Sequence, residues 1–324
     1  MTLQFNHLWK RVIPYQSAQY AQSYLQTCYK KKGIVDADVK SYNNSYPFMY
    51  YLEHGKNYYR LAYEAPVSIQ PVLLFYGMVQ LLKACLLTVD VDYPNSTSVL
   101  AHGVSTRKRK KQNYDFLFDE VKVQKNGLFT HFSQQMYNIS PQENQKYTMN
   151  DLLKRIPEVN HLYLKYNNKT PSRFIGKDSE QFLYIPTSVM DDLNMTKSRL
   201  KDFLEGQLRN NCKYYDEKSD YLLFEKSESH FSNFVPPLFY HLYDNSFYLP
   251  SERELFSPFP EVIVHYLMLY NLSMICRYET DWWSELYHTY ATNDFPFIIE
   301  FLQITSIKVP YLLFIFLDEQ TKKS

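Results

Sequence analysis

The chain has 324 residues, of which 45% are hydrophobic and 21% are charged. This balance excludes a disordered chain, and the length is sufficient for one large domain or two modest ones. The 35 Lys and Arg residues and the 34 Asp and Glu residues leave a net charge of +1, so a charged partner has to be bound by a local cluster rather than by the field of the whole protein.

Two residue types depart from average usage and predict the fold class. The chain contains 31 Tyr and 22 Phe but only 7 Gly. Aromatic side chains are therefore expected to dominate the interior, and the scarcity of glycine disfavours a protein rich in tight turns. We expect a mainly α (α+β) fold, in which N- and C-terminal helices form a bundle around a small mixed α/β insert.

The N-terminal part of the bundle is expected in residues 1–111. The pattern predicts a helix over residues 17–32 that Gly33 closes, and an aromatic helix over residues 47–63. Ser68 is positioned to cap the next helix, which is apolar except for a narrow stripe at i, i+4 and i+7. The stripe consists of Tyr76, Gln80 and Lys83.

The mixed α/β insert is expected in residues 112–250. Alternation around Asn126-Gly127 predicts a hairpin, and further strands are expected at residues 181–186 and 221–225 with a helix over residues 190–210 between them. A second hairpin is expected to turn at residues 244–246.

Residues 251–324 are expected to complete the bundle. Apolar helical patterns cover residues 260–278, 280–290, 293–306 and 309–320. The N-terminus lacks the apolar region of a signal peptide, and we expect no apolar run as long as the ~20 residues that span a bilayer. A cytoplasmic protein without a membrane partner is therefore expected.

Several common functions lack their sequence signatures. No two of the 7 glycines lie closer than 22 residues, which excludes the clustered glycines of dinucleotide-binding, P-loop and nucleophile-elbow motifs. The standard zinc and calcium motifs are absent, so no metal and no cofactor are expected. The four cysteines are scattered and predict buried free thiols; they are Cys28, Cys85, Cys212 and Cys276.

The strongest candidate site follows the apolar helix. His102-Gly103 precedes a run of five cations, which consists of Arg107, Lys108, Arg109, Lys110 and Lys111. Such a run attracts an anionic partner, and RNA, a nucleotide and an acidic protein surface all remain open. The alternative is a solvated loop that the acidic residues at 115, 119 and 120 partly neutralise.

His102 itself has two interpretations. A neutral imidazole at this position can act as an acid or base, or bind an anion beside Arg107. The alternative is a histidine that is hydrogen-bonded to backbone in a glycine turn.

A charged and aromatic corner is expected between two C-terminal helices. Arg277 lies at a helix C-terminus, where the dipole favours a cation, and it can reach Asp281 or Glu279. Of the adjacent Trp282 and Trp283, one is expected in the core and the other at an interface. We interpret the group Arg277, Asp281 and Trp282 as a structural corner.

Long segments of the chain resemble the YaaC-like protein family of bacilli and related Firmicutes. They are SYNNSYPFMYYLEHGKNYY, SIQPVLLFYGMVQLLKACLLTVD, SVLAHGVSTRKRKKQNY, MNDLLKRIPE and NLSMICRYETDWWSEL. The resemblance implies a cytoplasmic bacterial protein without an assigned activity and without catalytic residues to carry over. The genes of that family lie near the gene for IMP dehydrogenase in bacilli, which implies a link to that enzyme as a partner.

A more distant resemblance is to HEPN-like helical domains, many of which are metal-independent RNases with an Arg-x4–6-His motif. The one match here is Arg155 with His161, and Pro157 within it departs from that family's pattern. We therefore expect a non-enzymatic binding or regulatory protein, with an RNase that uses Arg155 and His161 as the alternative. A homo-oligomer also remains open.

Overall fold

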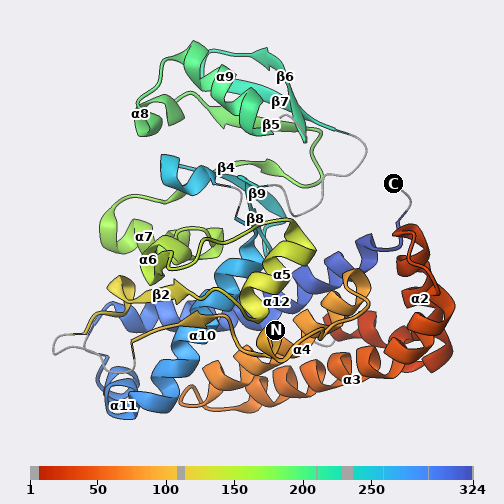
Figure 1. Ribbon diagram of the computed structural model, residues 1–324. Coiled ribbons are helices and arrows are strands. Elements are labelled where there is room, and N and C mark those ends of the chain that lie inside the picture. Colours follow the sequence, from red (N-terminus) through yellow and green to blue (C-terminus); the bar gives the residue numbers. More distant parts are fainter. Residues whose placement is uncertain are drawn as a thin grey trace. The chain divides into compact units, whose positions relative to one another are not determined.

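The computed structural model describes residues 7–107, 114–208, 211–227, 236–257, 259–290 and 292–322, and it confirms a mainly α (α+β) fold (Figure 1). The chain forms two compact units. Unit 1 comprises Met1–Met149 and His265–Ser324, and unit 2 comprises Asn150–Val264. The expected domains 1–111, 112–250 and 251–324 stay a prediction.

Unit 1 holds the long helices. They are α2 (Ala18–Lys31), α3 (Ala37–Glu64), α4 (Gln70–Val89), α5 (Leu128–Tyr137), α10 (Glu261–Tyr278, which enters unit 1 at His265), α11 (Thr280–Thr289) and α12 (Asp294–Glu319). Short 3-10 helices accompany them at Lys10–Val12 (η1), Pro14–Gln16 (η2), Thr97–Leu100 (η3) and Phe116–Phe118 (η4).

Helix boundaries follow the expected signals only in part. The helix expected over residues 17–32 is confirmed as α2, and the hydroxyl of Ser17 accepts from the N–H of Tyr20 and caps it. Two other expectations were wrong, because α3 begins ten residues before Pro47 and α12 continues through Pro310 as a single helix. Ser68 does not cap α4, whose N-cap is Ile69.

Helix α4 lies at the centre of unit 1, where it contacts α2, α3, α5 and α12. Glycines allow it to approach α3 closely: a Cβ on Gly55 would meet the Leu81 side chain at 2.7 Å, and one on Gly77 would meet the Tyr59 ring at 2.8 Å. Burial of each leucine-sized side chain on this helix contributes about 1.5–3 kcal/mol. The helix therefore anchors the segment that follows it.

Two helices, α4 and α12, are long and apolar enough to cross a membrane by length and composition. The expectation that no apolar segment reaches this length was wrong. In each helix 67% of the most apolar window is buried inside the protein, and a core helix passes the same test.

A small antiparallel sheet in unit 1 has the order β1-β2-β3, with β1 at Val104–Ser105, β2 at Glu120–Val123 and β3 at Lys146–Thr148. The hairpin predicted at Asn126-Gly127 was wrong, because the residues after Gly127 form α5 rather than a strand. Leu128, Phe129 and Phe132 are buried together on one face of α5. In a strand, the adjacent Leu128 and Phe129 would point to opposite faces, so only a helix buries all three on one side.

Unit 2 combines short helices with two further three-stranded antiparallel sheets, of order β4-β9-β8 and β5-β7-β6. The strands are β4 (Ser172–Lys177), β5 (Phe182–Pro186), β6 (Cys212–Glu217), β7 (Tyr221–Lys226), β8 (Phe239–His241) and β9 (Ser246–Pro250). The helices are α6 (Met149–Leu153), η5 (Pro157–Val159), α7 (Asn160–Asn167), α8 (Val189–Leu193), α9 (Lys197–Leu208) and η6 (Arg253–Phe256).

The predictions for unit 2 hold for the strands and fail for one helix. The hairpin around residues 244–246 is confirmed, with His241 opposite Ser246. The single helix expected over residues 190–210 is two helices, because Asn194 adopts a left-handed conformation between them. All four cysteines are free and buried, as predicted.

Candidate anion-binding site

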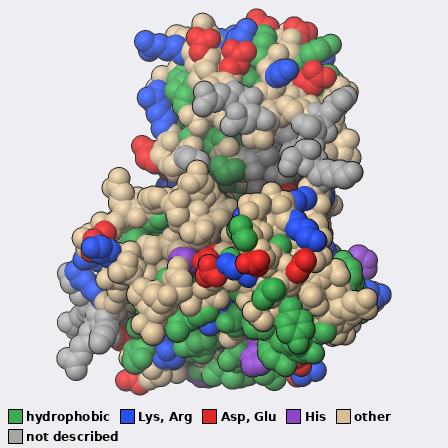
Figure 2. All heavy atoms as spheres, turned by 45° about the vertical axis from the view of Figure 1, so that its right-hand side comes forward, with side chains coloured by type: hydrophobic (Ala, Val, Ile, Leu, Met, Phe, Trp, Pro, Cys, Tyr) green, Lys and Arg blue, Asp and Glu red, His purple; other side chains and the backbone are tan. Residues whose placement is uncertain are grey.

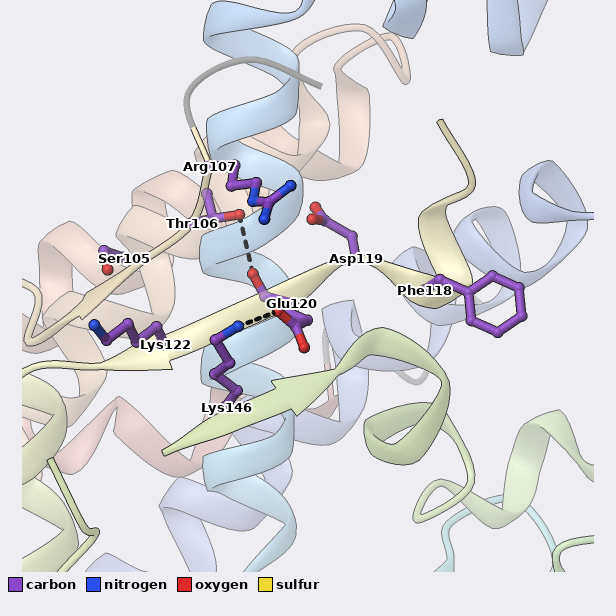
Figure 3. Close-up of a pocket in the computed structure, with 8 residues that line it drawn as sticks. All are labelled: Ser105, Thr106, Arg107, Phe118, Asp119, Glu120, Lys122 and Lys146. Carbon is purple, nitrogen blue, oxygen red and sulfur yellow. Dashed lines mark hydrogen bonds and ion pairs between the residues drawn. The ribbon is translucent and has the colours of Figure 1, made fainter. Parts of the chain in front are cut away.

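A pocket with a volume of about 340 Å³ lies on the β1-β2-β3 sheet of unit 1 (Figure 3). We call it the sheet pocket. It is lined by Ser105, Thr106, Arg107, Phe118, Asp119, Glu120, Lys122 and Lys146. All three strands or their direct extensions therefore contribute a basic side chain to it.

Hydrogen bonds fix the segment that carries Arg107. The hydroxyl of Thr106 donates to the carbonyl of Glu120 at 3.2 Å, and the Gln124 amide donates to Ser105 Oγ at 2.6 Å. The adjacent strand β1 pairs antiparallel with β2, with Val104 opposite Val123. The backbone is thus held against β2 up to the residue before Arg107.

The basic residues of the sheet pocket are only partly neutralised. Lys122 and Lys146 are directly opposite each other in the β2–β3 register, an arrangement that is destabilising for like charges. Lys146 forms an ion pair with Glu120 at 2.8 Å. In the part of the chain that the structure describes, neither Arg107 nor Lys122 forms an ion pair.

The carboxylate of Asp119 also lines the sheet pocket and accepts hydrogen bonds from neutral donors. Asp119 is 8% exposed, and its Oδ2 accepts from the Tyr114 hydroxyl at 2.7 Å and from the Asn271 amide at 2.8 Å. Figure 3 shows Arg107 and Asp119 on one side of the pocket and Lys122 with Ser105 on the other. A basic side chain therefore lies on each side of the pocket, and the one on the side of Arg107 has a carboxylate beside it.

The predicted basic run is described only at its first residue. Arg107 lines the sheet pocket, whereas Lys108, Arg109, Lys110 and Lys111 lie outside the described residues. The sequence missed Lys122 and Lys146, although the alternation in residues 120–123 signals that Lys122 points away from the buried Val121 and Val123.

His102 is not among the residues that line the sheet pocket. Its ring lies among Phe75, Tyr76 and Tyr270, with centroids 5.0, 6.2 and 5.7 Å away, and its carbonyl accepts from the Tyr266 hydroxyl. Burial lowers the pKa of His102, and the positive charges of Arg277 and Lys83 lower it further. The imidazole is therefore neutral near pH 7 and adds no charge to an anion site.

The candidate acid–base pair of the RNase alternative lies in unit 2. Arg155 donates to the carbonyls of Leu255 and Glu254 and to the hydroxyl of Ser257, so it holds the end of η6. The exposed His161 contacts the carbonyl of Glu158 through Nδ1 at 3.0 Å. The RNase hypothesis stays a prediction.

The corner at the end of α10 differs from the expected one in its contacts. Arg277 turns back along α10, donating from Nε to the Ser273 carbonyl at 3.0 Å and from Nη2 to Met274 Sδ at 3.1 Å. Among the described residues it forms no ion pair with Asp281 or Glu279, so that part of the prediction was wrong.

One of the two tryptophans of the corner lies in the core, as expected, and the interface role of the other stays a prediction. Trp283 is 2% exposed and belongs to the core. Trp282 is half-buried and packs edge-on against Tyr114, with ring centroids 4.5 Å apart. The residues after the basic run are thereby anchored on α11.

The comparison with known proteins gives one match. Residues 13–317 match the YaaC-like protein family, a range that covers nearly the whole chain. No curated protein and no solved structure matches the chain. The extent of the family match shows that this chain belongs to the YaaC-like protein family.

Proposed function

We propose that this YaaC-like chain is a non-enzymatic binding protein whose sheet pocket holds a phosphate group of a nucleotide. The observation that carries the proposal is the placement of Lys122 directly opposite Lys146, in a pocket that Arg107 also lines, with no ion-pair partner for Arg107 or Lys122 among the described residues. Like charges opposite each other cost about 0.2–1 kcal/mol, and a bound anion turns that cost into attraction.

The other lining groups favour phosphate among anions. Ser105 and Thr106 contribute hydroxyl groups to the lining, and phosphate accepts several hydrogen bonds at once. Arg107 can bind two phosphate oxygens through its planar fork, while Lys122 acts as a point charge. Phosphate has more acceptor oxygens than a carboxylate, so it can contact a basic group and a hydroxyl group of the lining at once.

The size and rim of the sheet pocket favour a nucleotide. Its volume of about 340 Å³ lies within the range of about 300–1,000 Å³ that is usual for small-molecule sites. Phe118 lines the pocket and is 74% exposed, so its ring is free to stack on a base.

Isothermal titration calorimetry with ATP, AMP and adenosine tests the proposal. We expect ATP and AMP to bind and adenosine to bind at least tenfold more weakly. Arg107→Gln and Lys122→Gln each remove a charge-assisted hydrogen bond, which corresponds to about a 10- to 100-fold loss of affinity for ATP.

Lys125→Gln is the matched control, because Lys125 is an exposed cation close to β2 that does not line the pocket. Its affinity for ATP should equal that of the wild type. Equal ATP affinity in all three variants excludes the sheet pocket as the site. Titration of a 12-nucleotide RNA and of an acidic peptide, with no ATP binding, would assign the charge to those partners instead.

A further inference from the structure

A second pocket of unit 1, with a volume of about 450 Å³, lies where the start of α4 meets the corner between α10 and α11. We call it the corner pocket. Its lining includes Ile69, Val72, Leu73, Cys276, Arg277 and Trp283, and it shares no residue with the sheet pocket. Figure 1 shows α11 next to the end of α10 in this unit.

Hydrogen bonds hold one wall of the corner pocket in place. The carbonyl of Ser68 accepts from the indole N–H of Trp283 at 3.0 Å and from the thiol of Cys276. Burial raises the pKa of Cys276 to about 11, so the thiol stays protonated and remains a donor. The wall is therefore formed before a ligand binds, and Cys276 is not a nucleophile at neutral pH.

The chemistry of the lining is apolar with a single charge. Arg277 is the one charged residue among the lining residues, and Asp281 of the neighbouring first turn is not part of the lining. The guanidinium has five N–H donors, of which two have acceptors among the described residues. Three donors therefore have no acceptor among the described residues, and the guanidinium also lies over the Tyr278 ring, 5.3 Å from its centroid.

The start of α4 adds to the positive potential. Its first turn contributes Val72 and Leu73 to the pocket, contains no acidic residue and has no side-chain cap. The positive end of the helix dipole is thus not compensated there. A small anionic head group with an apolar tail is complementary to this combination of charge and apolar surface.

We propose that the corner pocket binds an aliphatic carboxylate, with the carboxylate on Arg277 and the alkyl chain against Ile69, Val72, Leu73 and Trp283. A carboxylate matches the planar fork of one arginine. A phosphate dianion is disfavoured, because a pocket with one cation leaves half of its charge desolvated without a partner. This site does not depend on the function proposed for the sheet pocket.

Calorimetric titration of the full chain with octanoate, decanoate and octan-1-ol tests this proposal. Octanoate should bind at least tenfold more tightly than octan-1-ol, and each added methylene should tighten binding about fourfold, so decanoate should bind roughly 15-fold more tightly. Arg277→Gln should abolish the preference for octanoate over octan-1-ol. Arg60→Gln, at an exposed arginine of α3, is the matched control and should bind as the wild type does.

A second variant, Leu73→Trp, fills the corner pocket without altering Arg277 and should abolish the binding of both carboxylates. Far-ultraviolet circular dichroism establishes that each variant is folded, and this variant decides the question if Arg277→Gln does not fold. The proposal is overturned if the wild type does not bind octanoate at millimolar concentration. It is also overturned if octan-1-ol binds as tightly as octanoate, or if octanoate binds equally to wild type and Leu73→Trp.

Discussion

The backbones of Gly103 and Gly127 lie in close contact just before β1. We predict that Gly127→Ala, which adds one methyl group there, disturbs the sheet pocket. A Cβ on Gly127 would lie 2.2 Å from the Cα and 2.3 Å from the N of Gly103, and Gly127 has a φ of 142°, which side chains rarely adopt. The amide of Leu128 donates to the carbonyl of Ala101 at 2.7 Å, and that of Phe129 to His102 at 3.1 Å. Gly127→Ala therefore forces apart the backbone that leads to Arg107.

The magnitude follows from two contributions. A non-glycine residue in such a conformation costs about 1–3 kcal/mol. Overpacking against an atom that cannot move aside costs about another 1–3 kcal/mol. The sum of about 2–6 kcal/mol corresponds to a drop in melting temperature of roughly 5–20 °C for a unit of this size.

Thermal and urea unfolding followed by circular dichroism measures this loss. Gly206→Ala is the control, because Gly206 lies in α9 and a Cβ there meets no atom within 4 Å. This control should be more stable than the wild type by about 0.5–1 kcal/mol, since alanine is the better helix former. If Gly127→Ala unfolds at the wild-type temperature, the reasoning about the contact between Gly103 and Gly127 is refuted.

Three further predictions concern titratable groups. Burial, and then the nearby Asp115, raise the pKa of Asp294 from 3.8 to about 6, so the contribution of this carboxyl group to stability is lost as pH rises from about 4 to about 6. Asp294→Asn should remove up to about 3 kcal/mol of that decline in the free energy of urea unfolding. An unchanged pH profile of stability in the variant would contradict this prediction. By NMR His102 should titrate below 6.5, and Arg277→Gln should raise its pKa; no change would remove Arg277 as a cause. A thiol reagent should react with Cys28, Cys85 and Cys212 only after unfolding, and fast reaction of these thiols in the native protein would contradict their burial.

The helical part of the fold could be predicted where the sequence carries local signals. Ser17 and Gly33 bracket α2 because a cap and a left-handed residue act on their immediate neighbours. Pro47 and Pro310 misled the boundaries of α3 and α12, since each helix has buried residues on both sides of its proline and packs on neighbouring helices. Local rules do not include that packing energy.

The hairpin at Asn126-Gly127 shows a different limit. The dipeptide is a strong local turn signal, yet Gly127 is required here for its close approach to Gly103, a residue 24 positions earlier. The phenylalanines that follow it are buried in unit 1 as one face of α5. A short apolar run does not distinguish helix from strand without that context.

Of the basic residues that line the sheet pocket, the sequence pointed to Arg107 but not to Lys122 or Lys146. Arg107 was identified because five cations in sequence are visible without a structure. Lys122 and Lys146 are separated by 24 positions and meet only through the β2–β3 register. Figure 2 shows charges of both signs interspersed with apolar side chains on the face in view, consistent with a net charge of +1 and a local site.

On the proposed function, the opposed lysines of β2 and β3 reduce stability in the free protein, and an anionic ligand offsets this cost. Thermal unfolding of the wild type and of Lys122→Gln, each with and without ATP, tests it in one measurement. Without ATP the variant should be at least as stable as the wild type, because the repulsion of Lys146 is relieved by about 0.2–1 kcal/mol. Saturating ATP should raise the melting temperature of the wild type and leave that of the variant almost unchanged. Equal ATP-induced shifts in the two proteins, or no shift in either, would contradict the account.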